Sequence, residues 1–587
     1  MPTLHWIGKD KVVNHHQDVP FKVLEHKYGF TAENGEQTEQ TNNGNKIIHG
    51  DNLEALKALL PEYEGRIDVV YIDPPYNTGK EKWRYTDNVN HPKIQKWLDE
   101  IVGQEGEDLT RHDKWLCMMY PRIKLLHKLL KDDGVFYCSI DDYEQGNLKP
   151  MLDSIFGHQN FLNNIIWQRA YSPVNTKKRF SANHDFVVCY AKNKAQVELL
   201  LPRTEDANDR YSNRDNDPRG IWKSSDLSVG PVVEKQVYEI TTSSGRKVLP
   251  PNGYCWRVNS KKFKEMDLDN RIWWGEDGDN VPSIKRFLSE VKDGLTPMTV
   301  WTYSEVGHTQ DAKKEIKELF PKSKLPFETP KPTKLMEKIL SLKNNPDAIV
   351  LDSFAGTGST AHAVLKLNKK EGGNRKFILV ELEDYAEDIT ATRVKKAIQG
   401  YEFTGKKKNI LSSYSINVTN LKKSDKILEE LETFKKDDKY SQVKIEEENG
   451  NIAITGVENI SGKLEGTGGD FDFYELGQPI FKEDKNLNEE IGEEKIREYI
   501  YYTETKQHLS RKREEKHKYL LDIFNETAYY FYYEKDRLTS LDIETLNIVS
   551  EKSEQYLIYA DHCLLDKDYM LRKNIIFKKI PRDIKRF

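Results

Sequence analysis

The chain has 587 residues, of which 37% are hydrophobic, 32% charged and 11% aromatic. This length predicts several domains, and the aromatic content excludes an intrinsically disordered chain. Its 90 Lys and Arg residues are balanced by 95 Asp and Glu residues, which excludes a basic field over the whole surface, so any nucleic-acid surface must be local.

The sequence also argues against a membrane protein and a metalloprotein. Its longest apolar runs have the length of strands, far below the ~20 residues that cross a bilayer. The N-terminus lacks the apolar stretch of a secretory signal, so a cytoplasmic location is expected. The five cysteines have no CxxC spacing and no HExxH occurs, so no metal is expected.

Residues 1–44 are polar and predict an irregular N-terminal arm. Between residues 45 and 160, strands alternate with helices. The predicted strands are residues 46–49, 67–72 and 135–140, and the predicted helices are residues 52–60, 121–130 and 143–156. This alternation predicts a parallel, doubly wound sheet.

Residues 161–330 lose the alternation and form an insertion. They carry 27 Lys and Arg residues against 23 Asp and Glu residues, whereas the rest of the chain is net negative. They also hold six of the ten tryptophans, which are Trp167, Trp222, Trp256, Trp273, Trp274 and Trp301. Basic residues among aromatic ones favour a nucleic-acid surface, with the cluster Lys177, Lys178 and Arg179 among the expected phosphate contacts. The alternative is that the tryptophans fill the core of an irregular domain.

The alternation returns in residues 331–400. Strands are predicted at residues 348–352 and 377–382, between helices, so this segment supplies the second half of an α/β domain. Residues 401–587 are rich in Glu, Lys and Tyr and predict a mixed α/β C-terminal domain.

The motif Asp73-Pro74-Pro75-Tyr76 directly follows a predicted strand. The prolines fix φ, so the strand ends in a rigid turn at the crevice where α/β sheets bind ligands. The Asp73 carboxylate and the Pro74 carbonyl would accept both N–H bonds of an exocyclic amino group and localise its lone pair. Tyr76 supplies a flat face on which a base can stack. The alternative is a stiff turn with a purely structural role.

A second motif runs from a strand through a glycine-rich turn into a helix, and it includes Asp352, Phe354, Gly356 and Gly358. Glycines allow close approach of the backbone and the helix N-terminus offers N–H donors, which indicates a nucleoside cofactor. The Walker A and GxGxxG spacings are absent, so ATP hydrolysis is not expected. Glu381, at the end of the next predicted strand, is placed to accept hydrogen bonds from ribose hydroxyls.

Together the two motifs resemble those of the amino-methylating DNA methyltransferases that use S-adenosylmethionine. Their order resembles the circularly permuted β group of N6-adenine methyltransferases. The resemblance implies a permuted Rossmann-like α/β sheet, with a catalytic half in residues 45–160 and a cofactor half in residues 331–400. It makes residues 161–330 a target-recognition insertion. An Asp before Pro-Pro-Tyr, where cytosine-N4 enzymes usually carry Ser, favours adenine.

Site residues follow from the same resemblance. The catalytic residues are expected to be Asp73, Pro74, Pro75 and Tyr76. Residues 47–52 resemble the family's third-strand element and imply that Asp51 lies near the cofactor's adenine. Residues 329–335 resemble its KPxxL element and place Thr329 and Lys331 beside the methionine end of the cofactor. The expected cofactor-binding residues are thus Asp51, Thr329, Lys331, Asp352, Phe354, Gly356, Gly358 and Glu381.

A narrower resemblance, to the modification subunit of Type III restriction-modification systems, rests on residues 72–79, 300–303 and 468–477. It implies methylation of adenine N6 in duplex DNA by base flipping, a homodimer, a restriction subunit as possible partner, and an assembly or partner role for residues 401–587. Three alternatives stay open: mainly a recognition and assembly subunit for a separate nuclease-translocase, a stand-alone adenine methyltransferase, or an enzyme that methylates RNA or a protein glutamine.

Overall fold

The computed structural model describes residues 4–78, 109–173, 176–203, 205–292, 294–321, 330–415, 424–448 and 451–582. The chain divides into two compact units. Unit 1 contains residues 1–197, 298–340 and 345–587, and unit 2 contains residues 198–297 and 341–344. Across the described residues, no helix combines the length and the apolar character needed to cross a membrane.

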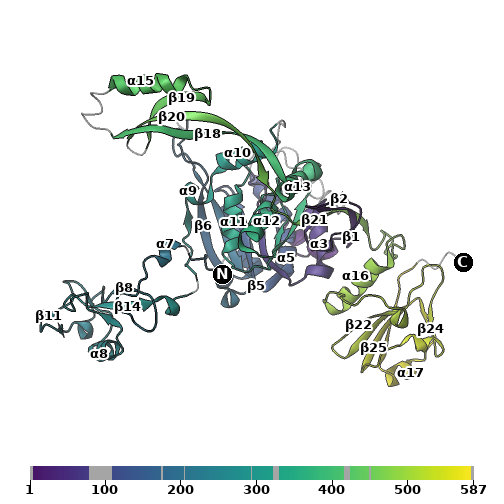
Figure 1. The fold of residues 1–587 in the computed structure, drawn as a ribbon. Coiled ribbons are helices and arrows are strands. Elements are labelled where there is room, and N and C mark those ends of the chain that lie inside the picture. Colours follow the sequence, from purple (N-terminus) through teal and green to yellow (C-terminus); the bar gives the residue numbers. More distant parts are fainter. Residues whose placement is uncertain are drawn as a thin grey trace. The chain divides into compact units, whose positions relative to one another are not determined.

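A large mixed sheet organises unit 1 (Figure 1). Its described strands lie in the order β15 (Val300–Trp301), β6 (Phe161–Gln168), β7 (His184–Ala191), β5 (Leu130–Ile140), β4 (Ile67–Ile72), β16 (Ile349–Asp352), β17 (Lys376–Glu381), β3 (Lys46–His49), β21 (Asp470–Pro479), β1 (Lys22–Thr31) and β2 (Gly35–Gln37).

Both predicted halves of the α/β domain meet in this sheet. Strand β4, from the catalytic half, pairs in parallel with β5 on one side and on the other with β16, from the cofactor half. All six residues of β4 are buried, as expected for a central strand covered on both faces. The predicted permuted α/β fold is therefore confirmed.

Helices connect the parallel strands and pack on the sheet. Their bounds are α3 (Asn52–Tyr63), α5 (Leu109–Leu129), α6 (Gln145–Phe156), α11 (Thr333–Ser341), α12 (Ser359–Glu371) and α13 (Thr392–Gln399). Helix α3 begins at Asn52 because the Asp51 side chain accepts hydrogen bonds from the next backbone N–H groups. Helix α5 begins well before the predicted residue 121 and carries Pro121 in its interior.

Residues 1–44 are not the irregular arm that their polar composition predicts. They form α1 (Lys9–Val12), α2 (His15–Asp18) and the strands β1 and β2. Strand β1 pairs antiparallel with β21, which in turn pairs with β3. Cross-strand pairs stabilise this edge, such as the stacked rings of Tyr28 and Phe473, whose centroids are 5.1 Å apart. A local sequence pattern does not predict such pairs, because their members are far apart in the chain.

The insertion is also shorter than predicted. Strands β6 and β7 pair antiparallel with each other, and β7 pairs with β5, so both belong to the sheet of unit 1. The alternation of strand and helix stops at residue 161 because these two strands form a hairpin, although the sheet continues. The separate unit is accordingly limited to residues 198–297 and 341–344.

Unit 2 has its own small core, formed by Leu227, Ile240, Val248, Trp256, Phe263, Ile272 and Ile284. Its elements include β8 (Trp222–Asp226), α8 (Ser260–Leu268), β13 (Ile272–Trp273) and β14 (Ser283–Phe287). Trp222 and Trp256 are fully buried here, as are Trp167 and Trp301 in unit 1. Four of the six clustered tryptophans therefore fill cores, and only Trp273 and Trp274 are partly exposed.

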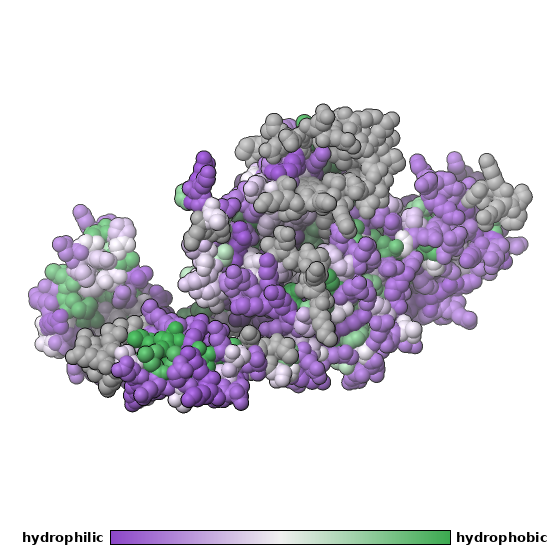
Figure 2. Space-filling model, turned by 90° about the horizontal axis from the view of Figure 1, so that it is seen from above, coloured by the Kyte–Doolittle hydropathy of each residue, from purple (hydrophilic) through white to green (hydrophobic). Residues whose placement is uncertain are grey.

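The C-terminal third begins with the antiparallel sheet of β18 (Gly400–Ser415), β20 (Asn451–Glu465) and β19 (Tyr440–Glu448), against which α15 (Ser424–Lys435) packs. Strand β21 then joins the large sheet. The remainder consists of α16 (Glu493–Thr505), α17 (Lys567–Arg572) and the sheet β22 (Leu520–Phe524), β23 (Thr527–Phe531), β25 (Gln555–Ala560) and β27 (Ile575–Lys579). The face seen in Figure 2 is mostly hydrophilic, in line with the charged composition.

Candidate active site

The two sequence motifs lie side by side at one edge of the sheet. Val69 pairs with Val350 and Val70 with Leu351, so the parallel strands β4 and β16 end together. The Asp73 turn follows β4 and the glycine turn follows β16. The carboxyl edge of a parallel sheet is where α/β folds bind ligands, so this edge is the candidate active site.

The turn of residues 73–76 is clamped by helix α5 and by the segment before α6. The indole N–H of the buried Trp115 donates to the Pro75 carbonyl at 2.8 Å. Asn77 is fully buried and has a φ of 57°, a conformation that Asn tolerates better than most residues. Its amide donates to the buried carboxylate of Glu144, which also bonds His112 at 2.6 Å. Sequence reasoning did not find these supports.

Lys331 lies on the turn of Asp73. Its ammonium donates to Asp73 Oδ2 at 2.5 Å and lies 5.0 Å from the centre of the Tyr76 ring. The Lys331 side chain is 8% exposed. Its ammonium thus contacts the turn of residues 73–76, and the expected place of Lys331 beside the cofactor stays a prediction. Thr329, the other expected residue of this element, lies outside the described residues.

Two polar atoms of the turn face inward. Asp73 Oδ1 and the Tyr76 hydroxyl are buried, and neither has a hydrogen-bond partner of ordinary geometry among the described residues. Burial, followed by the Asp73 charge, raises the pKa of Tyr76 well above its usual value. A buried polar atom without a partner is costly, so these atoms are suited to bind a ligand.

The glycine turn is held by two strand-end acids. Asp352 accepts from the backbone N–H of Phe354 at 3.0 Å and from the Thr360 hydroxyl at 2.6 Å. Glu381 Oε2 accepts from the backbone N–H of Gly356 at 2.7 Å. Burial raises the pKa of each acid to about 7. Asp352 therefore supports the turn, while Glu381 touches the backbone that a cofactor would approach.

The two glycines of this turn differ in what surrounds them. Both have positive φ, 52° at Gly356 and 78° at Gly358. A Cβ atom at Gly358 would lie 3.2 Å from the Thr390 carbonyl oxygen and 3.3 Å from its methyl group. Gly358 is thus needed where the turn packs on its own protein, and its contact with the cofactor stays a prediction.

A buried arginine that sequence reasoning missed joins the glycine turn to its neighbours. Arg393, on α13, is fully buried and donates to the hydroxyls of Thr357 at 2.9 Å and Ser359 at 3.1 Å. It also donates to the Thr333 hydroxyl at 2.9 Å and to Glu315, on α10 (Thr309–Leu319), at 3.4 Å. One guanidinium thereby fixes the turn against α10 and α11.

Asp51 lies at the same edge, at the end of β3. Its Oδ1 accepts from the Leu53 backbone N–H at 2.8 Å, and its Oδ2 lies 3.2 Å from the Arg122 guanidinium. The neighbouring Asn52 amide donates to the Ser353 carbonyl at 2.8 Å. Asp51 is therefore a helix cap beside the glycine turn, and contact with the cofactor stays a prediction.

One further acid lies among these groups. Asp185, on β7, is 5% exposed and forms an ion pair with Arg169 at 2.8 Å. Burial raises its pKa to about 6, although the charges of Lys331 and Arg169 act in the opposite direction. An acid directly before the apolar run of residues 186–191 is a signal in the sequence, but sequence reasoning did not use it.

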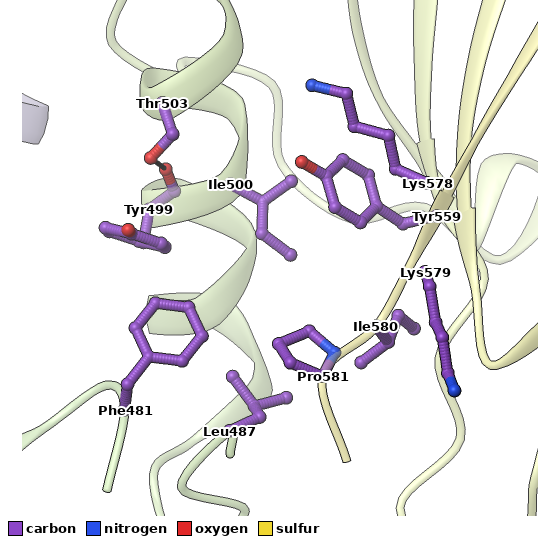
Figure 3. Close-up of a pocket in the computed structure, with 10 residues that line it drawn as sticks. All are labelled: Phe481, Leu487, Tyr499, Ile500, Thr503, Tyr559, Lys578, Lys579, Ile580 and Pro581. Atoms are coloured by element: carbon purple, nitrogen blue, oxygen red, sulfur yellow. Dashed lines mark hydrogen bonds between the residues drawn. The ribbon is translucent and has the colours of Figure 1, made fainter. Parts of the chain in front are cut away.

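A cavity of about 400 Å³ in the C-terminal third is lined by Phe481, Leu487, Ile500 and Pro581, with Tyr559 and Lys578 at one end (Figure 3). It contains none of the predicted site residues. Within the described part of the chain, no group of three or more His, Cys, Asp or Glu side chains is arranged to hold a metal ion.

Comparison with known proteins agrees with this geometry. Residues 67–392 match the family model described as DNA methylase, and they include β4, the turn of residues 73–76 and the glycine turn. The chain belongs to this DNA methylase family.

Among similar proteins, the Type III restriction-modification enzyme StyLTI Mod subunit of Salmonella typhimurium is 33% identical over 62% of this chain and 56% of its own. The EcoP15I Mod subunit of Escherichia coli is 29% identical over 66% of this chain and 65% of its own. The chain thus spans about three fifths of the length of these Mod subunits.

Solved structures of related fold are more distant. The cytosine-N4-specific PvuII DNA methyltransferase is 16% identical over 60% of this chain and 86% of its own, with a TM-score of 0.31. The complex of M1.HpyAVI with SAM is also 16% identical, over 59% of this chain and 98% of its own, with a TM-score of 0.27. Overlap at this level places no individual residue.

Proposed function

We propose that this protein transfers a methyl group from S-adenosylmethionine to the N6 atom of adenine in duplex DNA. The observation that carries the proposal is the pairing of β4 with β16, which brings a turn suited to an amine and a turn suited to a nucleoside to one edge of the sheet. Holding donor and acceptor together in this way removes much of the entropy cost of their encounter.

The turn of residues 73–76, here called the acceptor turn, has the groups that an exocyclic amine requires. Asp73 Oδ1 is buried and inward-facing, and it would accept one N–H bond of the amine, with the Pro74 carbonyl accepting the other. The Tyr76 ring would stack on the base once it is extruded from the duplex. Trp115 and Glu144 hold this turn rigid, so little reorganisation is needed during the reaction.

The glycine turn fits a nucleoside. Gly356 has no side chain to block approach, and Glu381, bonded to its backbone, would accept hydrogen bonds from a ribose diol. Phe354 is almost buried at the same turn. The buried Ser353 hydroxyl has no hydrogen-bond partner among the described residues, which leaves one donor available to a ligand. When bound there, S-adenosylmethionine would supply the methyl group on a cationic sulfonium.

We further propose a role as the modification and recognition subunit of a Type III restriction-modification system, acting on DNA in the cytoplasm. The similarity to two Mod subunits supports this, as does the presence of unit 2 within the chain, at the position expected for target recognition. A homodimer and a restriction subunit as partner, with residues 401–587 as the assembly surface, belong to the same proposal.

A second candidate is a chain that chiefly directs a separate nuclease-translocase. The Mod subunits that it resembles are named as parts of restriction-modification enzymes, which supports this alternative. Methylation by the isolated chain separates the two, because a mere recognition subunit would bind DNA specifically without modifying it.

The deciding experiment incubates the purified chain with S-adenosylmethionine and plasmid DNA, followed by single-molecule sequencing. We expect N6-methyladenine in one sequence context, and we expect Asp73→Ala to reduce the rate by about 100-fold or more because an acceptor for the amine is removed. The matched control is Asp347→Ala, an exposed acid before the opposite end of β16. Normal methylation by Asp73→Ala would refute the assigned role.

A further inference from the structure

Lys331 contacts the acceptor turn and not the glycine turn alone. Its ammonium donates to Asp73 Oδ2 at 2.5 Å, which leaves Oδ1 as the buried oxygen without a hydrogen-bond partner of ordinary geometry among the described residues. The two oxygens of one carboxylate are therefore in different states. One oxygen accepts from a cation of the protein, and the other is buried beside the Tyr76 hydroxyl, which interacts with Asp73.

Packing fixes the ammonium in this position. The rings of Tyr76 and Trp167 lie 5.0 and 5.9 Å from Lys331 Nζ. The Lys331 carbonyl accepts from the Ser359 hydroxyl at 3.0 Å, so its backbone is tied to the start of α12. A cation over aromatic faces and largely removed from water interacts strongly with a nearby carboxylate.

A second acid, Asp185, interacts with the charges of this pair. It is buried on β7, directly opposite Trp167 of β6 in the strand register, and forms an ion pair with Arg169 at 2.8 Å. Lys331 thus contacts Asp73, whose side chain is 24% exposed, and acts on the charge of the buried Asp185.

We propose that Lys331 is a positioning residue for Asp73: it occupies Oδ2, fixes the orientation of the carboxylate and so reserves Oδ1 as an acceptor for the substrate amine. This inference rests on the proposed amine methylation, and it assigns to Lys331 a role on the substrate side of the site instead of contact with the cofactor.

Orientation matters here because the amine needs an acceptor in one place. A carboxylate without a fixed partner can rotate, whereas the contact of Lys331 with Oδ2 holds Oδ1 in one direction. The Lys331 side chain is 8% exposed, so water competes little for this contact.

The test compares wild type, Lys331→Met and Lys331→Arg in single-turnover methyl transfer with both ligands saturating, and cofactor affinity is measured by calorimetry. Without the ammonium the Asp73 carboxylate is no longer held in place, so we expect the transfer rate of Lys331→Met to fall by about tenfold or more. Cofactor affinity should stay within about threefold, and Lys331→Arg should restore most of the rate because it keeps a cationic donor.

Rescue by arginine makes the test specific. A merely structural defect would weaken cofactor binding together with the transfer rate, and arginine would not restore the rate. The proposal is overturned if Lys331→Met loses about tenfold or more in cofactor affinity with an unchanged transfer rate, or if Lys331→Arg is as slow as Lys331→Met.

A wild-type protein that transfers no methyl group would refute the proposed function separately. The pairing of Lys331 with Asp73 is then still measured by thermal unfolding. Lys331→Met removes the cation that contacts Asp73 and Lys331→Arg keeps one, so the first variant should melt below wild type and the second close to it. Equal melting temperatures of wild type and Lys331→Met would contradict the inference.

Discussion

Glu381 shows how burial prepares a side chain for a ligand. Its two oxygens accept backbone N–H groups from Gly356 and Glu383, at 2.7 and 3.0 Å, while the side chain is 2% exposed. Burial raises its pKa to about 7 against these hydrogen bonds, so the free protein carries a mixture of both forms near neutral pH. A ligand that donates to this carboxylate will draw it into the ionised form.

We therefore predict that cofactor affinity rises with pH between 6 and 8 and is constant above pH 8. The total rise in affinity should be about tenfold for each unit by which binding lowers the pKa of Glu381. Glu381→Gln should bind more weakly and lose this dependence, because the amide does not titrate. Calorimetric titration of S-adenosylmethionine at several pH values measures both. Glu33→Gln, in an exposed turn, is the control. A wild-type affinity independent of pH would contradict the assignment.

At the scale of elements, one helix residue holds the cofactor half together. Arg393 of α13 bonds the glycine turn, α11 and α10 at once, with its side chain fully buried. Buried charges are costly unless every donor is used, so the network has to form as a whole or not at all. The shape of the glycine turn thus depends on helices that are not adjacent to it in the sequence.

Replacing this guanidinium tests that dependence. We expect Arg393→Met to lower the free energy of unfolding by about 2–3 kcal/mol and to weaken cofactor binding, because Thr357 and Ser359 lose their shared donor. Chemical denaturation and calorimetry measure the two effects. Lys395→Met, on the same helix with a partly exposed ion pair to Glu387, should cost no more than about 1 kcal/mol. Equal losses in both variants would show that Arg393 has no special role.

At the scale of the whole molecule, the basic residues differ in how free they are to bind DNA. Arg219, in unit 2, already pairs with Asp217 at 2.8 Å, and Lys262 pairs with Glu265 at 3.2 Å. Lys177, Lys178 and Arg179 are exposed and form no ion pair with another described residue. The second group has charge to offer to phosphates, whereas the first has partly neutralised it.

We predict that replacing Lys177, Lys178 and Arg179 by Ala weakens DNA binding. The slope of the logarithm of the binding constant against the logarithm of the salt concentration should become shallower by about 1 for each phosphate that the variant no longer binds. Affinity measured at several salt concentrations gives this slope. A triple Ala variant of Lys482, Lys485 and Lys495, in the C-terminal third, is the control for net charge. An unchanged slope in the first variant would remove residues 177–179 from the DNA surface.

The sequence by itself determined the chemistry at the edge of the sheet. Asp73 and Gly356 each follow a buried apolar strand, and parallel strands end at the same edge, so their meeting could be predicted although some 280 residues separate them. The order of the two halves was predictable for the same reason. The motifs are local, and the rules that place strand ends are general.

Only the tertiary structure decided the rest. The ammonium of Lys331 on Asp73, the buried Asp185 and the network of Arg393 arise from contacts between distant segments, which no periodicity encodes. The pairing of β1 with β21 brings residues before 45 into the sheet, and the hairpin of β6 with β7 brings residues after 160 into it. Both predicted domain boundaries therefore differ from the observed ones, because a strand is assigned to a sheet by its partner and not by its own composition. Local pattern specifies which groups carry the chemistry, and long-range packing specifies what those groups contact.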